Sequence, residues 1–315
     1  MSFLSWLVGV VSTTAGTLKI FKKFKWIYRL ALPDVWRLDF RKHPPAPLPL
    51  HFVDLGMYKL ISQRLARGAA GVFVHWGIPH GGKSVCGLAV AHEIWKQNRG
   101  VLHIDCHMVP LGDDVDKWFR KALKIPSACD DVPLIEYLAP GGPTSFDLES
   151  ADPIDATIIL DHFDHVMQIR NWESCLKSWA HLAYGSRRFN VMLCVTSEMH
   201  ASQIILLNGG RKFKYLGLDI PNYGKWLEPD ITALVGKLSD QDAHGAPKIE
   251  DGDRVRLITY GVLSGSPYPI IEAWDRGFDN IDWARIESMA RMASDDWHAA
   301  AQIRAAEDVA AERRT

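Results

Sequence analysis

The residues with the clearest chemical meaning lie between positions 71 and 84, where an apolar run leads into the pattern Gly-x-x-x-x-Gly-Lys-Ser. The glycines let the backbone turn tightly, so that successive N–H groups can face a phosphate. Lys83 is placed to reach the β- and γ-phosphates and Ser84 to ligate Mg²⁺, while a helix over 85–96 would add its N-terminal dipole. The predicted phosphate-binding residues are Gly77, Ile78, Pro79, His80, Gly81, Gly82, Lys83, Ser84 and Val85.

A second motif is the apolar stretch 157–160, which ends at Asp161 and continues as His-Phe-Asp-His. In P-loop enzymes an acid at this place holds Mg²⁺, so we expect Ser84 and Asp161 to hold the metal. His162 stands where many P-loop hydrolases carry a glutamate, and a neutral imidazole brings no fixed negative charge to orient water. Two accounts stay open: Asp164 is the catalytic base, or hydrolysis is slow and the nucleotide acts as a switch. His162 itself as the base is a third.

Two further polar groups flank the fourth apolar run. Thr196 ends that run, and a hydroxyl there would lie beside the γ-phosphate because ligands sit at the carboxyl ends of parallel strands. A strand-end threonine is equally explained by the turn that follows. Arg188 lies just before the run and would reach a neighbouring subunit's γ-phosphate as a catalytic arginine, although a solvated basic turn is the simpler interpretation.

The charge distribution sets the N-terminal segment apart. The chain has 315 residues and a net charge of −1, but residues 1–43 carry eight Lys/Arg against two Asp, leaving the remainder at −7. Residues 1–18 are uncharged but marginal in length for a bilayer span, and residues 19–30 interleave basic and aromatic side chains, as suits an anionic membrane surface. An organellar targeting peptide and an ordinary packed helix remain alternatives.

The five cysteines show no Cys-x-x-Cys spacing, which favours buried reduced thiols and an intracellular protein. With the basic leader, the expected location is the cytosolic face of a membrane, and organellar targeting stays open.

Five apolar runs alternate with helical segments, an arrangement typical of parallel strands covered on both faces. The expected strands are 71–76, 101–106, 156–160, 191–196 and, more weakly, 213–218. The expected helices are 53–67, 85–96, 113–123, 132–138, 229–238, 253–263, 268–276 and 283–313, the last one solvated or partner-binding. The predicted organisation is a basic hydrophobic segment over 1–43, a proline-rich linker over 44–50, a nucleotide-binding core over 51–222, a helical lid over 223–280 and an alanine-rich helix over 281–315.

The order of these parts resembles the AAA+/STAND branch of P-loop ATPases over about residues 53–276. Asp161-His-Phe-Asp-His is similar to the D-G-h-D-E form of the second motif in STAND NTPases of the NACHT kind. It matches at Asp161 and Asp164 and departs at His162 and His165. The departures concern turnover more than binding.

The segment 263–269 contains Gly-Ser-Pro and resembles the Gly-x-Pro lid signature of STAND and archaeal-type ATPases, which implies that Pro267 lies against adenine. No arginine stands at the usual second-sensor place, which again fits the STAND side. The resemblance implies an α/β fold with a five-stranded parallel sheet in the order 5-1-4-3-2, helices on both faces and a C-terminal helical lid, with ATP and Mg²⁺ between sheet and lid.

Three functions follow as hypotheses. The first is a membrane-tethered ATPase or ATP-dependent switch whose nucleotide state changes its self-association. The second is a nucleic-acid motor, whose basic pore loop would be Arg211, Lys212 and Lys214, although the acidic core makes nucleic acid the less favoured partner. The third is a scaffold that binds nucleotide without hydrolysing it.

Overall fold

The computed structural model describes residues 44–67, 71–77, 81–108, 156–186, 189–207, 213–216, 225–240, 249–278 and 281–312, together with 115, 117 and 119. The predictions for residues 1–43 and for a helix over 132–138 lie outside these ranges. Within the described part of the chain, no helix is both long and apolar enough to cross a membrane.

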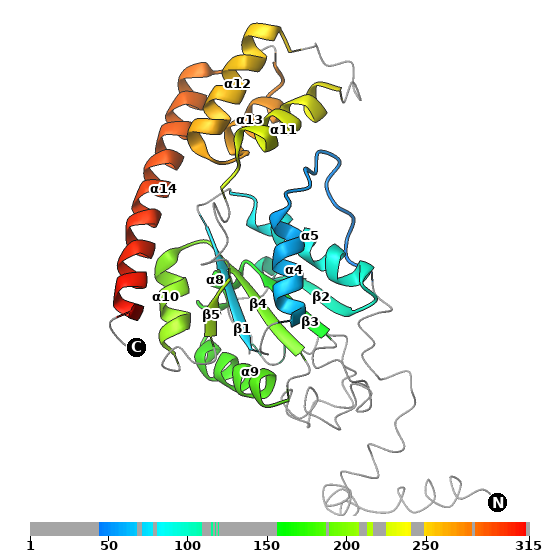
Figure 1. Cartoon of the computed structure of the whole chain (residues 1–315), viewed down its shortest axis with the longest axis vertical. Coiled ribbons are helices and arrows are strands. Elements are labelled where there is room, and N and C mark those ends of the chain that lie inside the picture. Colours follow the sequence, from blue (N-terminus) through cyan, green and yellow to red (C-terminus); the bar gives the residue numbers. More distant parts are fainter. Residues whose placement is uncertain are drawn as a thin grey trace, which may run out of the picture.

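The centre of the molecule is a parallel sheet of five strands in the order β2-β3-β4-β1-β5 (Figure 1). The strands are β1 (Val72–Trp76), β2 (Gly100–Asp105), β3 (Ala156–Asp161), β4 (Phe189–Val195) and β5 (Phe213–Tyr215). Both β1 and β4 are buried along their whole length, as expected for strands covered on two faces. The predicted sheet and its order, 5-1-4-3-2 when read from the other edge, are confirmed.

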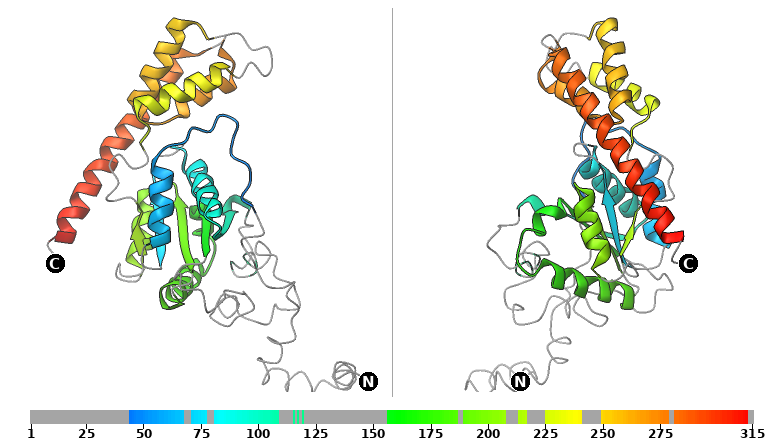
Figure 2. Two further views of the ribbon diagram at one scale, coloured as in Figure 1. Left: turned by 45° about the vertical axis from the view of Figure 1, so that its right-hand side comes forward. Right: turned by 90° about the vertical axis from the view of Figure 1, so that its left-hand side faces the viewer.

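Helices lie on both faces of the sheet (Figure 2), and a cluster of buried apolar side chains fills the space on each face. Because side chains alternate along a strand, Val72 and Val74 belong to one cluster and Phe73 to the other. The first cluster is formed with α9 (Trp172–Ser186) and α10 (Glu198–Leu206), and the second with α4 (Met57–Arg67) and α5 (Lys83–Lys96). The predicted placement of helices on both faces is therefore confirmed.

A buried asparagine ties the sheet to α4 at the end opposite the strand carboxyl termini. Asn190 lies in β4, where its side-chain oxygen accepts a hydrogen bond from Gly71 N–H at 3.1 Å and its amide donates to the carbonyl of Leu65. All three groups are buried, so each bond satisfies a polar atom that water does not reach.

The C-terminal part of the chain is helical and stands beyond the carboxyl edge of the sheet (Figure 1). It contains α11 (Glu228–Asp240), α12 (Asp251–Ser264), α13 (Tyr268–Asp275) and α14 (Trp283–Glu312). Gly261 of α12 lets α11 and α13 pack close to the α12 backbone. A Cβ at this position would lie 2.7 Å from side-chain atoms of both Ile231 and Ile270. The helices α11 and α13 thus pack on α12 through a position without a side chain.

Several boundaries differ from the sequence prediction. The helix α4 begins at residue 57 rather than 53, because residues 52–55 are non-helical and bury Val53 and Leu55. The last helix is not wholly solvated: Ile286 and Ala290 are buried where α14 packs against α12 and α13. Three helices that the sequence analysis did not delimit follow β3 and β4, namely α8 (Phe163–Val166), α9 and α10.

Candidate functional site

The glycine-rich segment lies between β1 and α5, and the structure describes its two ends, Gly77 and residues 81–84. Gly82 has φ 86°, a left-handed backbone conformation that suits glycine, and its carbonyl accepts a bond from Cys86 N–H at 2.8 Å as α5 begins. The Lys83 ammonium donates to the carbonyl of Gly77 at 2.9 Å. The lysine stem therefore folds back across the loop to the end of β1. Ile78, Pro79 and His80 lie outside the described residues.

The Lys83 side chain is largely buried, which disfavours its charged form. Burial lowers its pKa to about 8, while neighbouring Cys194, Asp164 and Asp161 act in the opposite direction without cancelling that effect. A buried ammonium is destabilising unless an anion compensates it. The Lys83 ammonium is thus a largely buried cation at the carboxyl end of β1.

His162 occupies the centre of the site. Its φ of 51° lies in the left-handed region, which explains why a glycine is typical here in the motif that this segment resembles. Its Nε2 lies 3.3 Å from the hydroxyl of Ser84, and its Nδ1 lies 3.6 Å from the buried Asp161 carboxylate. The imidazole ring therefore lies between the two predicted Mg²⁺ ligands.

Asp164 and Thr196, predicted separately as base and sensor, contact each other. One Asp164 oxygen accepts from Thr196 N–H at 3.2 Å and the other from the Thr196 hydroxyl at 3.1 Å. The contact joins the short helix α8 after β3 to the residue that follows β4, next to it in the sheet. Ser197 has a structural role, because its hydroxyl accepts from His200 N–H and caps α10.

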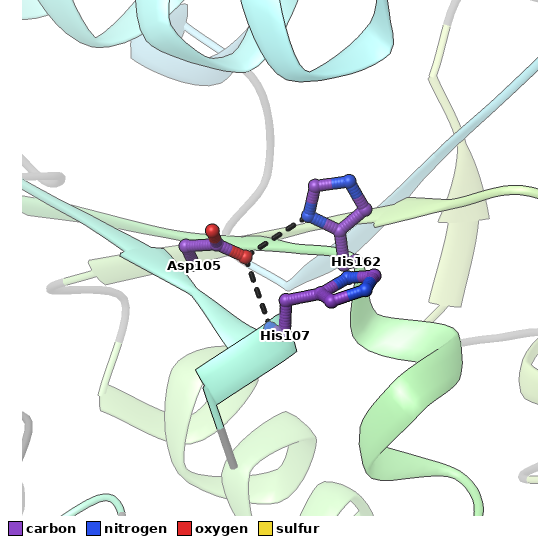
Figure 3. Close-up of side chains that lie close together, drawn as sticks. All are labelled: Asp105, His107 and His162. Atoms are coloured by element: carbon purple, nitrogen blue, oxygen red, sulfur yellow. Dashed lines mark hydrogen bonds and ion pairs between the residues drawn. The ribbon is translucent and has the colours of Figure 1, made fainter. Parts of the chain in front are cut away.

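Two functional candidates were missed in the sequence, Asp105 and His107. Asp105 ends β2 and pairs in register with Asp161, and its Oδ1 accepts from the His107 N–H and from His162 Nδ1, each at 3.0 Å (Figure 3). Partial burial raises the pKa of Asp105, but these two hydrogen bonds outweigh it and the net direction is downward. The sequence did contain a signal for them: the expected strand over 101–106 leads into Asp105-Cys-His107, and a parallel sheet can bring this acid beside Asp161 at the end of the strand over 156–160.

Stacked and edge-on histidine rings complete this edge. The His107 ring centre lies 4.7 Å from that of His162, nearly perpendicular, and 5.5 Å from that of His165, nearly parallel. His103, two residues before Asp105, is largely buried, and burial lowers its pKa. In the described part of the chain its Nε2 has no hydrogen-bond partner.

A buried tryptophan connects the loop with the helical part of the chain. A Cβ added at Gly82 would lie 3.6 Å from Trp226 Nε1, and the backbone N–H of Trp226 donates to the carbonyl of Gly265 at 2.9 Å. Gly265 ends α12 in a left-handed conformation, and the buried Pro267 precedes α13. Trp226 thus lies next to both the Gly-Ser-Pro turn and Gly82 of the glycine-rich segment.

The predicted site residues converge at the carboxyl edge of the sheet wherever they are described. Those brought together by direct contacts or shared elements are Gly77, Gly82, Lys83, Ser84, Asp161, His162, Asp164 and Thr196. Gly81 adjoins Gly82, and Val85 lies in the first turn of α5. Arg188 lies outside the described residues. Lys214 is exposed on β5, while Arg211 and Lys212 also lie outside them.

No protein-family model and no curated protein matches the sequence. Among solved structures, the chain is similar to a Walker-type ATPase of Pyrococcus abyssi, with 13% identity, 88% of this chain and 80% of that chain covered, and a TM-score of 0.43. It is also similar to domain III of the replication initiation protein DnaA of Thermotoga maritima, with 11% identity, 84% and 97% covered, and a TM-score of 0.38. A third is C. elegans PCH-2, with 11% identity, 76% and 66% covered, and a TM-score of 0.38.

The strand order and the place of the glycine-rich segment, rather than these distant likenesses, identify the fold. A strand, a glycine loop and a helix that begins at the lysine are followed by an acid two strands away in the sheet. The chain therefore has the fold of a P-loop NTPase, with the strand order that the resemblance of its motifs implied.

Proposed function

We propose that this chain binds a nucleoside triphosphate with Mg²⁺ at the carboxyl edge of the sheet and works as a switch that hydrolyses it slowly. The carrying observation is the start of α5, where Gly82 has a left-handed backbone and the Lys83 ammonium lies at the carbonyl of Gly77, at the end of β1. A lysine ammonium in this place can reach the β- and γ-phosphates of a nucleotide bound there. ATP is the proposed nucleotide on the family resemblance of the motifs.

The donors at the site fit Mg²⁺, which binds oxygen and keeps several waters. Ser84 and Asp161 would hold it, since both lie against the same imidazole and offer a hydroxyl and a carboxylate. A bound Mg²⁺ would neutralise negative charge on the phosphates. The chain's own part is to orient the phosphates through the loop N–H groups and Lys83, with Pro267 proposed against the adenine.

Two contacts support slow turnover. His162 replaces the carboxylate that would orient water, and Asp164 already accepts hydrogen bonds on both oxygens from Thr196. We infer that Asp164 positions Thr196 beside the γ-phosphate instead of acting as a strong base. Without a dedicated base, the expected turnover is on the order of 10⁻³ per second, the range of unstimulated switch NTPases.

The remaining elements of the proposal concern assembly. Residues 1–43 would tether the core to an anionic membrane surface, and Arg188 would reach a neighbouring copy's γ-phosphate on self-association. Co-sedimentation of the full chain with anionic and with neutral vesicles tests the tether, and binding to neither kind would overturn it.

The central test is ATP binding and single-turnover hydrolysis by the full chain, by Lys83→Ala and by Lys237→Ala. Lys237 is a matched control, because it is an exposed lysine that also donates to a backbone carbonyl, that of Phe52. We expect the first variant to lose binding and the control to keep it. Equal binding by Lys83→Ala would overturn the nucleotide site.

The same assay separates the switch from the alternatives. Turnover of about 1 per second or faster would overturn slow hydrolysis and make Asp164→Asn the next variant to measure. Stimulation by single-stranded nucleic acid at low salt would favour the motor over the switch. Binding with no turnover at all would favour the scaffold.

A further inference from the structure

We propose that Asp105, His107 and His162 form a binding site for a transition-metal ion of the Zn²⁺ class, separate from the Mg²⁺ position and adjoining it. This inference goes beyond nucleotide binding, because it concerns a second ion with different ligand chemistry.

The three side chains come from neighbouring elements and converge at one point (Figure 3). Asp105 ends β2, His107 lies in the 3₁₀ turn η3 (Cys106–Met108), and His162 lies in the turn between β3 and α8. One ligand atom from each lies within 4.8 Å of the others. The tightest pair, Asp105 Oδ1 and His162 Nδ1, is 3.0 Å apart.

These separations suit a metal of that size. With metal–ligand bonds of about 2.0–2.1 Å in a tetrahedral arrangement, the ligand atoms lie about 3.3 Å apart. The Asp105–His162 pair at 3.0 Å is already close to this spacing, and the His107 ligand atom lies within 4.8 Å of both. Asp105 and His162 keep 51% and 31% of their side-chain surface exposed, so an ion has a path to the site.

The donor types select the class of metal. Two imidazoles and one carboxylate are ligands of Zn²⁺ and similar transition metals, whereas Mg²⁺ and Ca²⁺ take oxygen ligands. Three protein ligands leave one position open, as in exchangeable or catalytic zinc sites and unlike closed structural sites.

The surroundings hold the ligands in place before any ion binds. The His107 N–H donates to Asp105 at 3.0 Å and aims its carboxylate, while the His165 ring stacks on His107 with planes 13° apart. Such outer contacts orient metal ligands and raise affinity. The left-handed backbone at His162 directs its ring toward both Asp105 and Ser84.

The site would couple to the nucleotide through Ser84, and this consequence rests on the proposed function. In the neutral ring the proton on Nδ1 faces the Asp105 carboxylate, which only accepts, so Nε2 accepts from the Ser84 hydroxyl. A metal bound through Nδ1 requires the other neutral tautomer: the Nδ1 proton is released to solvent, Nε2 takes up a proton from solvent, and the Nε2–H then donates to Ser84. A lone pair that Mg²⁺ would use is then engaged, so the two ions oppose each other, and by linkage the effect is reciprocal.

The direct test needs no nucleotide. The full chain, stripped of metal, is titrated with Zn²⁺ against a chromophoric chelator, alongside His107→Ala, Asp105→Asn and the control His298→Ala, an exposed histidine on α14. Because losing an outer contact alone lowers metal affinity about 10–100-fold, losing a ligand should lower it at least about 10-fold. The control should bind one ion as the wild type does.

Absence of saturable Zn²⁺ binding, or equal affinity in His107→Ala and Asp105→Asn, would overturn the site, provided that circular dichroism shows the variants folded. Coupling is tested separately, by the affinity for Mg²⁺-nucleotide with and without Zn²⁺. We expect Zn²⁺ to weaken it about 5-fold or more in the wild type and not in His107→Ala. A chain that binds no nucleotide would refute the proposed function and leave the Zn²⁺ titration as an independent result.

Discussion

Replacing Lys83 with methionine should stabilise the nucleotide-free protein while abolishing nucleotide binding. Methionine keeps the length of the stem and removes the ammonium, whose burial lowers the pKa from its ordinary value of 10.5 to about 8. The ammonium that would bind phosphate therefore lowers the free energy of unfolding when no phosphate is bound. Functional sites commonly carry such a cost in stability.

The magnitude follows from linkage between proton binding and folding. Below pH 8 the lysine is charged in both states, and the difference between 8 and 10.5 corresponds to a cost of about 3 kcal/mol. Losing the hydrogen bond from the charged ammonium to Gly77 costs the variant about 1.5–3 kcal/mol, so its net gain at pH 7 is about 1 kcal/mol. Between pH 8 and 10.5 only the unfolded chain holds the proton, so wild-type stability rises with pH relative to the variant. The gain should have vanished by pH 9.5.

The assay is urea unfolding of both proteins at pH 7 and pH 9.5, compared as a difference so that other titrating groups cancel. Lys237→Met is the control, since it removes an exposed ammonium that also donates to a backbone carbonyl, and its effect should be small at both pH values. Saturating ATP and Mg²⁺ at about 100 times the dissociation constant should add about 2.7 kcal/mol to the wild type only. A variant less stable than the wild type at pH 7, or a difference that does not change with pH, would refute the reasoning.

Three other predictions concern the frame around the site. Gly261→Ala should lower the urea midpoint, because overpacking costs about 1–3 kcal/mol against a helix gain of about 1, while Gly252→Ala, with open space around it in the same helix, should raise it. Asn190→Ala should cost about 3 kcal/mol in urea unfolding, because it leaves a buried N–H and a buried carbonyl without partners. In the native protein, mass spectrometry after iodoacetamide treatment at pH 8 should find Cys175 labelled before Cys86, which is buried and whose pKa burial raises; equal labelling would contradict the packing.

The sheet could be predicted because its physical signals are strong. Runs that are apolar throughout have few alternatives to parallel strands, and each predicted run overlaps a strand in the order that the resemblance implied. The ends of the helices were predicted less accurately, because the apolar spacing that indicates a helix can continue beyond the residue where the helix begins or ends. Residues 52–55 continue the apolar spacing of α4, yet they pack in an extended form that only the tertiary structure decides.

The proximity of the α5 N-terminus to Asp161 and His162 could be predicted from the sequence, whereas the contacts of Asp105 and His107 could not. Lys83, Ser84 and Asp161 carry fixed spacings with known chemistry, and the structure brings them together. Asp105 and His107 carry no such spacing, since Asp105 reaches His162 only because β2 pairs in register with β3. Both Asp105 and Asp161 end strands that are neighbours in the sheet. This shared feature could identify Asp105 as a candidate only once the strand order is known.

His162 is the residue that connects Ser84 with Asp105 in the site. A side chain at φ 51° costs about 1–2 kcal/mol that a glycine would avoid, so its presence calls for a gain from the side chain itself. Its ring contacts Ser84 through Nε2 and Asp105 through Nδ1, the two residues that we propose as ligands of Mg²⁺ and of the second ion. A water-activating base would need an open face toward the γ-phosphate, whereas both nitrogens of this ring are engaged. The geometry thus favours a role for His162 in which an ion bound at Asp105 changes the affinity for an ion at Ser84, over a role as the base that accelerates hydrolysis.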